Sequence, residues 1–138
     1  MTRLLVAAAV AALSGLPALA QAATPLGLEL NALQPSDKGC RITLVASNGL
    51  GAALDKASFE LALFGANGGI DRLVSVDFKT LPVGKTKVLQ FELAGLDCAA
   101  VTRVLINDVT SCEGAGLDPA ACATNLVTSS RVDATFGL

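Results

Sequence analysis

The chain has 138 residues, enough for one domain, and its ten basic and twelve acidic residues give a formal net charge of −2. The basic residues are interleaved with acids, and no Trp or Tyr is present on which bases could stack, so the composition argues against nucleic-acid binding. The chain also has no His, the commonest general base and metal ligand, which excludes catalytic arrangements built on that residue. We therefore expect a protein without a cofactor and without enzymatic activity.

The N-terminal segment predicts a cleavable secretory signal. A short positive start with Arg3 precedes an unbroken apolar run over residues 4–13, and small residues follow at Ala20 and Ala22. Cleavage after Ala22 or after Ala20 fits this pattern. An uncleaved anchor is the alternative, but the apolar run is shorter than the roughly 20 residues that span a bilayer. We expect a signal helix at residues 1–22, export to the periplasm or the medium, and no membrane insertion after cleavage.

The remaining residues, 23–138, predict a single all-β domain. Apolar and polar side chains alternate in short runs bounded by Gly, Pro and Asn, which is typical of antiparallel strands with one face on a core. Seven such strands are predicted, at residues 26–31, 40–47, 58–63, 73–79, 87–93, 101–109 and 126–136. About seven strands with regular turn signals indicate an immunoglobulin-like antiparallel β-sandwich.

The phenylalanines support a core between two sheets. Four of them alternate with polar neighbours and are expected to be buried, namely Phe59, Phe78, Phe91 and Phe136. Phe64 falls on the polar phase of its strand and is expected at the surface or as a plug of the following turn.

Four Cys residues in an exported chain of this size imply two disulfides, for which three pairings exist. If the fifth predicted strand pairs antiparallel with the second, Cys40 and Cys98 fall at the same end of the sandwich. Cys112 and Cys122 flank one Gly- and Pro-rich loop. We therefore predict the pairs Cys40–Cys98 and Cys112–Cys122. A redox site is disfavoured because no Cys-x-x-Cys is present.

Other chemical motifs are weak. Gly84-Lys85-Thr86 ends like a phosphate-binding loop, but the upstream Gly is missing and the context is strand–turn–strand, so we expect a hairpin turn.

Paired carboxylates, as in glycosidases, are a second hypothesis, with Asp71 and Asp77 or Asp108 and Glu113 as the candidate pairs. Calcium is a minor alternative, because no spacing matches a known calcium loop. Its ligands would be Asp108, Glu113 and Asp118.

The strand and turn motifs carry a resemblance. The Asn48-Gly49 strand exit, the Asn67-Gly68-Gly69 turn and the stretch Leu81-Pro82-Val83-Gly84-Lys85-Thr86 resemble the small extracellular immunoglobulin-like modules of bacteria. More narrowly, the stretches Gly39 to Thr43 and Leu96 to Thr110 are similar to a group of small exported alphaproteobacterial proteins known mainly by their signal sequence. That resemblance implies a link to TonB/ExbB-type systems of the cell envelope. The Arg-Arg pair that the group's usual signal carries is absent here.

The function that we expect is binding of a protein partner in the cell envelope by a non-enzymatic accessory module. The loop between Cys112 and Cys122 is the predicted contact surface, through Glu113, Asp118 and Pro119. A structural subunit of a surface fibre, completed by strand exchange, is the alternative, because the alternation in the last strand continues almost to the last residue. A small hydrolase that uses carboxylates alone is a third hypothesis.

Overall fold

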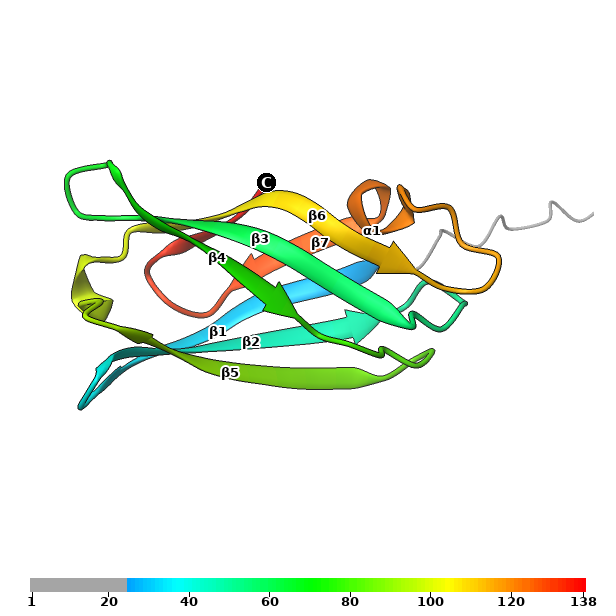
Figure 1. Cartoon of the computed structure of the whole chain (residues 1–138), viewed down its shortest axis with the longest axis horizontal. Coiled ribbons are helices and arrows are strands. Elements are labelled where there is room, and N and C mark those ends of the chain that lie inside the picture. The colour runs from blue at the N-terminus through cyan, green and yellow to red at the C-terminus, as the bar shows by residue number, and fades with distance from the viewer. Residues whose placement is uncertain (1–24) are drawn as a thin grey trace, which may run out of the picture.

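The computed structural model describes residues 25–138. The predicted signal segment and both of its cleavage positions lie outside the described residues. In the described part of the chain, eight strands form two four-stranded sheets that face each other (Figure 1). Two short helices, η1 (Cys98–Ala100) and α1 (Ala121–Thr124), lie in the connections.

The first sheet has the strand order β5-β2-β1-β7. Its strands are β1 (Leu26–Ser36), β2 (Gly39–Asn48), β5 (Thr86–Ala94) and β7 (Leu126–Ser130). The β2–β5 pairing is antiparallel, as the disulfide prediction required, and the β1–β2 pairing is antiparallel too. The β1–β7 pairing is parallel.

The second sheet has the order β4-β3-β6-β8. Its strands are β3 (Lys56–Phe64), β4 (Ile70–Asp77), β6 (Arg103–Glu113) and β8 (Thr135–Gly137). β3 pairs antiparallel with β4 and β6, whereas β6 and β8 run parallel. Both sheets are therefore mixed, which corrects the expectation of a purely antiparallel sandwich.

The core lies between the sheets, where the period-two pattern predicted it. Phe59 and Phe78 are fully buried and meet edge to face, with ring centroids 6.1 Å apart. Phe91 and Phe136 are partly buried and pack against this core. Phe64 lies on the outer face, where the guanidinium of Arg103 sits 5.4 Å from the ring centroid, a cation–π distance.

The last predicted strand, 126–136, is wrong as a single element. β7 ends at Ser130 in the first sheet, and the chain then crosses to the second sheet to form β8. The hydroxyl of Ser130 accepts a hydrogen bond from the Val132 backbone N–H and donates to the Ala134 carbonyl, 2.7 Å away. These bonds form a turn that an alternating apolar pattern does not reveal.

The sixth predicted strand ends four residues later than expected. β6 continues to Glu113 because its second half pairs with the start of β3, down to the pair Lys56 and Glu113. The register shifts twice along this pairing, with Asn107 and Thr110 as the extra residues. These two β-bulges explain the irregular apolar pattern of the segment.

Both predicted disulfides are confirmed. Cys40–Cys98 joins β2 to η1, and Cys112–Cys122 joins the end of β6 to α1. No free cysteine remains, and two disulfides indicate folding in an oxidising, extracytoplasmic environment.

The open side of the sandwich, between the edge strands β4 and β5, carries two inward-facing cations. Arg72 of β4 pairs with the buried Leu63, and its guanidinium donates a 2.9 Å hydrogen bond to the carbonyl of Ala94 at the end of β5. Lys87 of β5 donates to the carbonyls of Phe78 and Thr80. Inward-pointing charges are a known means of preventing further strands from pairing with a sheet edge.

Candidate functional site

The loop closed by Cys112 and Cys122 projects from the end of β6 (Figure 1). Both cysteines are buried, and the three residues predicted for partner contact, Glu113, Asp118 and Pro119, are all exposed. The sequence-based choice of this loop as an accessible surface therefore agrees with the burial pattern.

The loop has a rigid base. The backbone N–H of Asp55 donates a 2.7 Å hydrogen bond to the Glu113 carbonyl. Gly114 packs so closely on the neighbouring loop that a Cβ there would lie 2.4 Å from the carbonyl oxygen of Ala53, a distance that no side chain tolerates. Asp118 has a local role, since its carboxylate accepts a hydrogen bond from the Ala120 N–H at the start of α1. These contacts therefore hold the loop rigidly against the rest of the sandwich.

A groove of about 310 Å³ runs between this loop and the middle of β6. We call it the β6 groove. It is lined by Ile106, Asn107, Asp108, Val109, Pro119, Ala120, Ala123 and Leu138. The groove brings together two residues from different sequence-based hypotheses. Pro119 was predicted to contact a partner, whereas Asp108 was considered only as a possible catalytic or calcium-binding carboxylate. Glu113 and Asp118 are not among its lining residues.

One edge of β6 is open along this groove. β3 pairs with the whole of β6, but β8 pairs only with Arg103 to Leu105 on the other side. Among the described residues, no strand pairs with that side of β6 from Ile106 onward. Sequence reasoning missed this feature, because it depends on where β8 ends relative to β6, and no local pattern encodes that position.

The outer face next to the groove carries two neighbouring carboxylates. Glu60 of β3 is the direct cross-strand partner of Asp108. Like charges at directly opposed positions are destabilising. The side-chain amide of Asn107, the bulge residue, donates a 2.6 Å hydrogen bond to Glu60. Among the described residues, neither carboxylate takes part in an ion pair.

The proposed carboxylate pairs are not brought together. Asp71 and Asp77 lie six positions apart on β4, about 20 Å at the rise of a strand, and Asp108 and Glu113 lie about 15 Å apart along β6. Glycosidase carboxyls are about 5–10 Å apart. Within residues 25–138 no cluster of three or more acids and cysteines is arranged to hold a metal ion, so the calcium set of Asp108, Glu113 and Asp118 does not converge.

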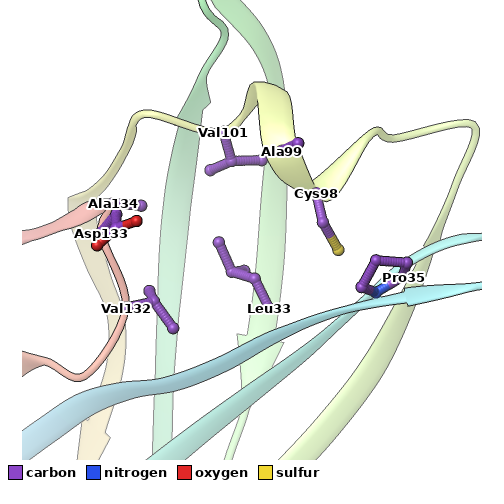
Figure 2. A pocket seen from close by; sticks show the side chains of 8 residues that line it. All are labelled: Leu33, Pro35, Cys98, Ala99, Val101, Val132, Asp133 and Ala134. Carbon is purple, nitrogen blue, oxygen red and sulfur yellow. The ribbon is translucent and has the colours of Figure 1, made fainter.

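A second hollow of about 310 Å³ opens at the opposite end of the sandwich (Figure 2). It exists because β1 continues past Leu30, the last residue that pairs with β7. Leu33 and Val132 face each other across it, below Val101 and Ala99 of the connection around η1 (Figure 2). Its lining is apolar apart from Asp133.

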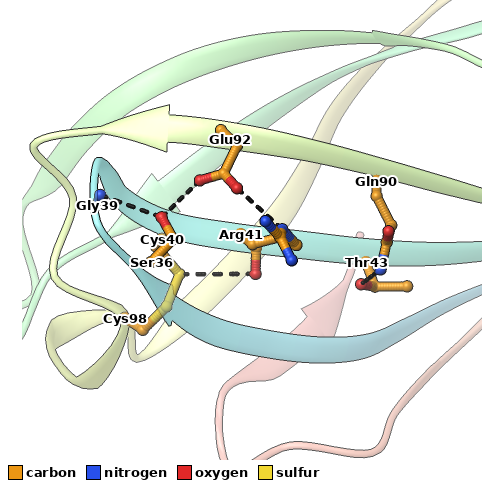
Figure 3. Close-up of polar contacts among 8 residues, drawn as sticks. All are labelled: Ser36, Gly39, Cys40, Arg41, Thr43, Gln90, Glu92 and Cys98. Atoms are coloured by element: carbon orange, nitrogen blue, oxygen red, sulfur yellow. Dashed lines mark hydrogen bonds and ion pairs between the residues drawn. A yellow bond between two sulfur atoms is a disulfide. The ribbon is translucent and has the colours of Figure 1, made fainter.

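The hairpin that joins β1 and β2 carries a cluster of polar side chains that hydrogen-bond to one another (Figure 3). Glu92 of β5 accepts hydrogen bonds from the Ser36 hydroxyl and from the Arg41 guanidinium, the latter at 2.9 Å. These hydrogen bonds, the Ser36 bond first, hold the pKa of Glu92 below its ordinary value. The cluster is exposed and cross-links β1, β2 and β5.

No protein-family model matches the chain, and no curated protein or solved structure matches it either. Within the part of the chain that the structure describes, no helix is long and apolar enough to cross a membrane.

Proposed function

We propose that this protein is a non-enzymatic, exported β-sandwich module that binds a protein partner in the cell envelope through the β6 groove. One observation supports the proposal: a stretch of the β6 edge with which no strand of residues 25–138 pairs lies beside a loop that is closed by a disulfide. Exposed strand edges and loops fixed on a rigid scaffold are the usual contact sites of such domains.

The module is immunoglobulin-like in our proposal. The orders β5-β2-β1 and β4-β3-β6 correspond to the strands E-B-A and C′-C-F of a variable-type immunoglobulin sandwich. β7 would then take the place of the last strand beside β1, whereas β8 runs parallel to β6 and departs from the antiparallel pairing of that sandwich. The two disulfides and the three-part N-terminal pattern support export to the periplasm or the medium.

The perturbed carboxyls support a structural role over a catalytic one. Asp77, Glu29 and Glu92 have pKa values below their ordinary range, and in each case the largest cause is a hydrogen bond from a near neighbour. These partners are the Lys79 backbone N–H for Asp77, the Asn31 amide for Glu29 and the Ser36 hydroxyl for Glu92. The Asp77 bond fixes the turn after β4, the Glu92 bond joins β5 to β1, and the Glu29 bond links two residues of β1; a lowered pKa makes each of these three carboxylates a weaker base.

Affinity capture from envelope extract tests the proposal. The bait is the full mature protein, and the variant has residues 114–120 replaced by Gly and Ser with both cysteines retained. Loss of partners from the variant supports the assignment. A matched control replaces the exposed turn at residues 66–68 in the same way and should retain them. Partners that bind the loop variant and the wild type equally would refute the loop and groove as the contact surface.

A fibre subunit completed by strand exchange is the second candidate. The observation in its favour is that β8 pairs with only three residues of β6, so that no strand among the described residues pairs with the rest of that edge, where a strand from another copy could add. Sedimentation over a wide concentration range distinguishes the two. Concentration-dependent linear assembly would favour the fibre subunit, whereas a monodisperse monomer at high concentration would argue against it.

A further inference from the structure

The groove provides two kinds of contact that an extended chain can use. The open edge of β6, from Ile106 to Ser111, presents main-chain N–H and C=O groups without a strand partner among the described residues. Such an edge is a template for an added strand, in which main-chain hydrogen bonds give affinity and pockets for alternate side chains give specificity.

The walls of the groove are small and apolar. α1 and the residues before it contribute Pro119, Ala120 and Ala123, and β6 contributes Ile106 and Val109. Alanine side chains leave space beside the strand edge that a larger apolar side chain of a partner would fill. Successive residues of a strand point to opposite sides, so only every second residue of the partner would enter the groove.

The charges around the groove are of one sign. Asp108 lines it, Glu60 lies opposite Asp108 on β3, across β6 from the open edge, and Glu113 and Asp118 lie on the loop beside it. The three ion pairs of the described residues use other acids, namely Glu29, Asp71 and Glu92. No Lys or Arg occurs in the sequence between Arg103 and Arg131. A partner with cationic side chains would therefore meet unpaired carboxylates.

The Glu60–Asp108 pair adds an independent argument. Two carboxylates at directly opposed positions cost folding free energy, and within residues 25–138 the one side-chain hydrogen bond to them comes from Asn107 and reaches Glu60. Residues that weaken a fold and face a binding surface are typical of sites that a ligand completes. A cation placed between them would turn the repulsion into two attractive contacts.

Resting on the proposed function, we propose that the β6 groove binds an extended segment in which basic and apolar residues alternate. The segment adds a strand to the edge of β6 between Ile106 and Ser111. Its apolar side chains enter the groove, and its Lys or Arg side chains meet Asp108 and extend over β6 toward Glu60.

Binding of synthetic peptides to the mature protein tests this. A ten-residue peptide that alternates Lys and Val should bind, and one that alternates Glu and Val should not. Amide chemical-shift changes should centre on residues 106–111 and 119–123. Raising the salt from about 50 to about 500 mM should weaken binding, because exposed charges are screened. Methylation of the peptide nitrogens that face β6 should abolish binding if main-chain hydrogen bonds carry it.

Two variants separate binding from folding. The double variant Glu60→Gln with Asp108→Asn should bind the Lys peptide roughly tenfold more weakly, while its own stability stays equal or rises because the repulsion is gone. Asp37→Asn with Asp133→Asn, two exposed acids that do not line the groove, is the charge-matched control. Ala123→Trp should fill the groove and block binding, whereas Ala115→Trp, on the same loop but outside the groove, should not.

The possible outcomes separate the strand-addition proposal from the protein-binding function on which it rests. If neither peptide binds but envelope partners still depend on the loop, the strand-addition inference is overturned and the protein-binding function stands. Equal binding of the Lys and Glu peptides would overturn the charge assignment. Unchanged binding by methylated peptides would overturn the strand pairing. If the loop variant also keeps every envelope partner, both proposals fail.

Discussion

The side-chain amide of Asn48 donates a 2.8 Å hydrogen bond to the carbonyl of Leu81, 33 residues away in the sequence. The same amide donates to the Ala52 carbonyl, and its oxygen accepts from the Leu50 backbone N–H. Asn48 is only 1% exposed. One buried side chain therefore ties the end of β2 to two separate loops, at the end of the sandwich from which the Cys112–Cys122 loop projects (Figure 1).

We expect Asn48→Ala to destabilise the protein by about 2–4 kcal/mol, because it removes the three hydrogen bonds of a buried side chain, to the Ala52 and Leu81 carbonyls and from the Leu50 N–H. Urea unfolding of the oxidised protein measures this. Asn67→Ala is the matched control, since the Asn67 side chain accepts an exposed hydrogen bond from the Gly69 N–H, whose loss should cost less than about 1 kcal/mol. Equal losses in the two variants would contradict the role of Asn48.

The two disulfides should differ in their contributions. Replacing both Cys40 and Cys98 by Ser should cost about 4 kcal/mol, and replacing Cys112 and Cys122 about 3 kcal/mol, because the first pair closes a longer loop of the unfolded chain. Denaturant midpoints under oxidising conditions check the order.

The Cys112–Cys122 variant carries a second expectation. Hydrogen exchange should quicken first in α1 and the loop around Asp118, since that disulfide fixes α1 to the end of β6. Exchange that quickens uniformly over both sheets would be inconsistent with a local bracing role.

We expect the free energy of unfolding to fall at acid pH, because Asp77 becomes protonated. Its carboxylate accepts a 2.7 Å hydrogen bond from the backbone N–H of Lys79, a residue held at φ 57°, and a 3.0 Å bond from the Ser58 hydroxyl. The Lys79 bond is the largest cause that lowers the pKa of Asp77 below its ordinary value of 3.8. Because the folded pKa is depressed, the stabilisation is complete above the unfolded pKa and is lost as the pH falls through the folded pKa.

Two measurements check this. The Asp77 carboxyl should titrate in the folded protein with a midpoint below 3.8. Asp77→Asn should show a shallower loss of stability than the wild type as the pH falls from about 5 to about 2. A midpoint at or above the ordinary value would show that the turn does not hold the charged form.

The inward cations of the open side should control self-association. Arg72→Leu and Lys87→Leu remove the two side chains that bridge β4 and β5 to neighbouring carbonyls. Free, apolar strand edges promote pairing between copies, so both variants should associate at lower concentration than the wild type. Light scattering measures this, with Lys85→Leu in the exposed turn as the control. Association that increases equally in all three variants would point to surface hydrophobicity alone.

Much of the fold could be predicted from local patterns in the sequence. Alternation of apolar side chains located β1 to β6, because the two faces of a strand meet different environments. The turn residues marked where most of these strands end. The disulfide pairing followed from the antiparallel partnership of two strands, and the exposed loop followed from its Gly, Pro and acidic composition.

Only part of the candidate site could be predicted from the sequence. Pro119 and its loop were found because they are locally unusual, whereas the groove depends on β8 ending at Gly137 beside Leu105. The break between Ser130 and Thr135 was missed for the same reason, since the alternation of Val132, Ala134 and Phe136 is equally consistent with one strand or two. Asp108 appeared as an isolated carboxylate until the pairing set it opposite Glu60.

The sequence by itself determined the strands from β1 to β6, most of their turns, the two disulfides and the loop at the end of β6, because each depends on the chemistry of neighbouring residues or on one strand pairing. Only the tertiary structure decided which strand edge stays open, which acids face each other and which side chains close the open side of the sandwich. Those features are set by the register and length of strands that are distant in the chain, through backbone hydrogen bonds that every residue type can make.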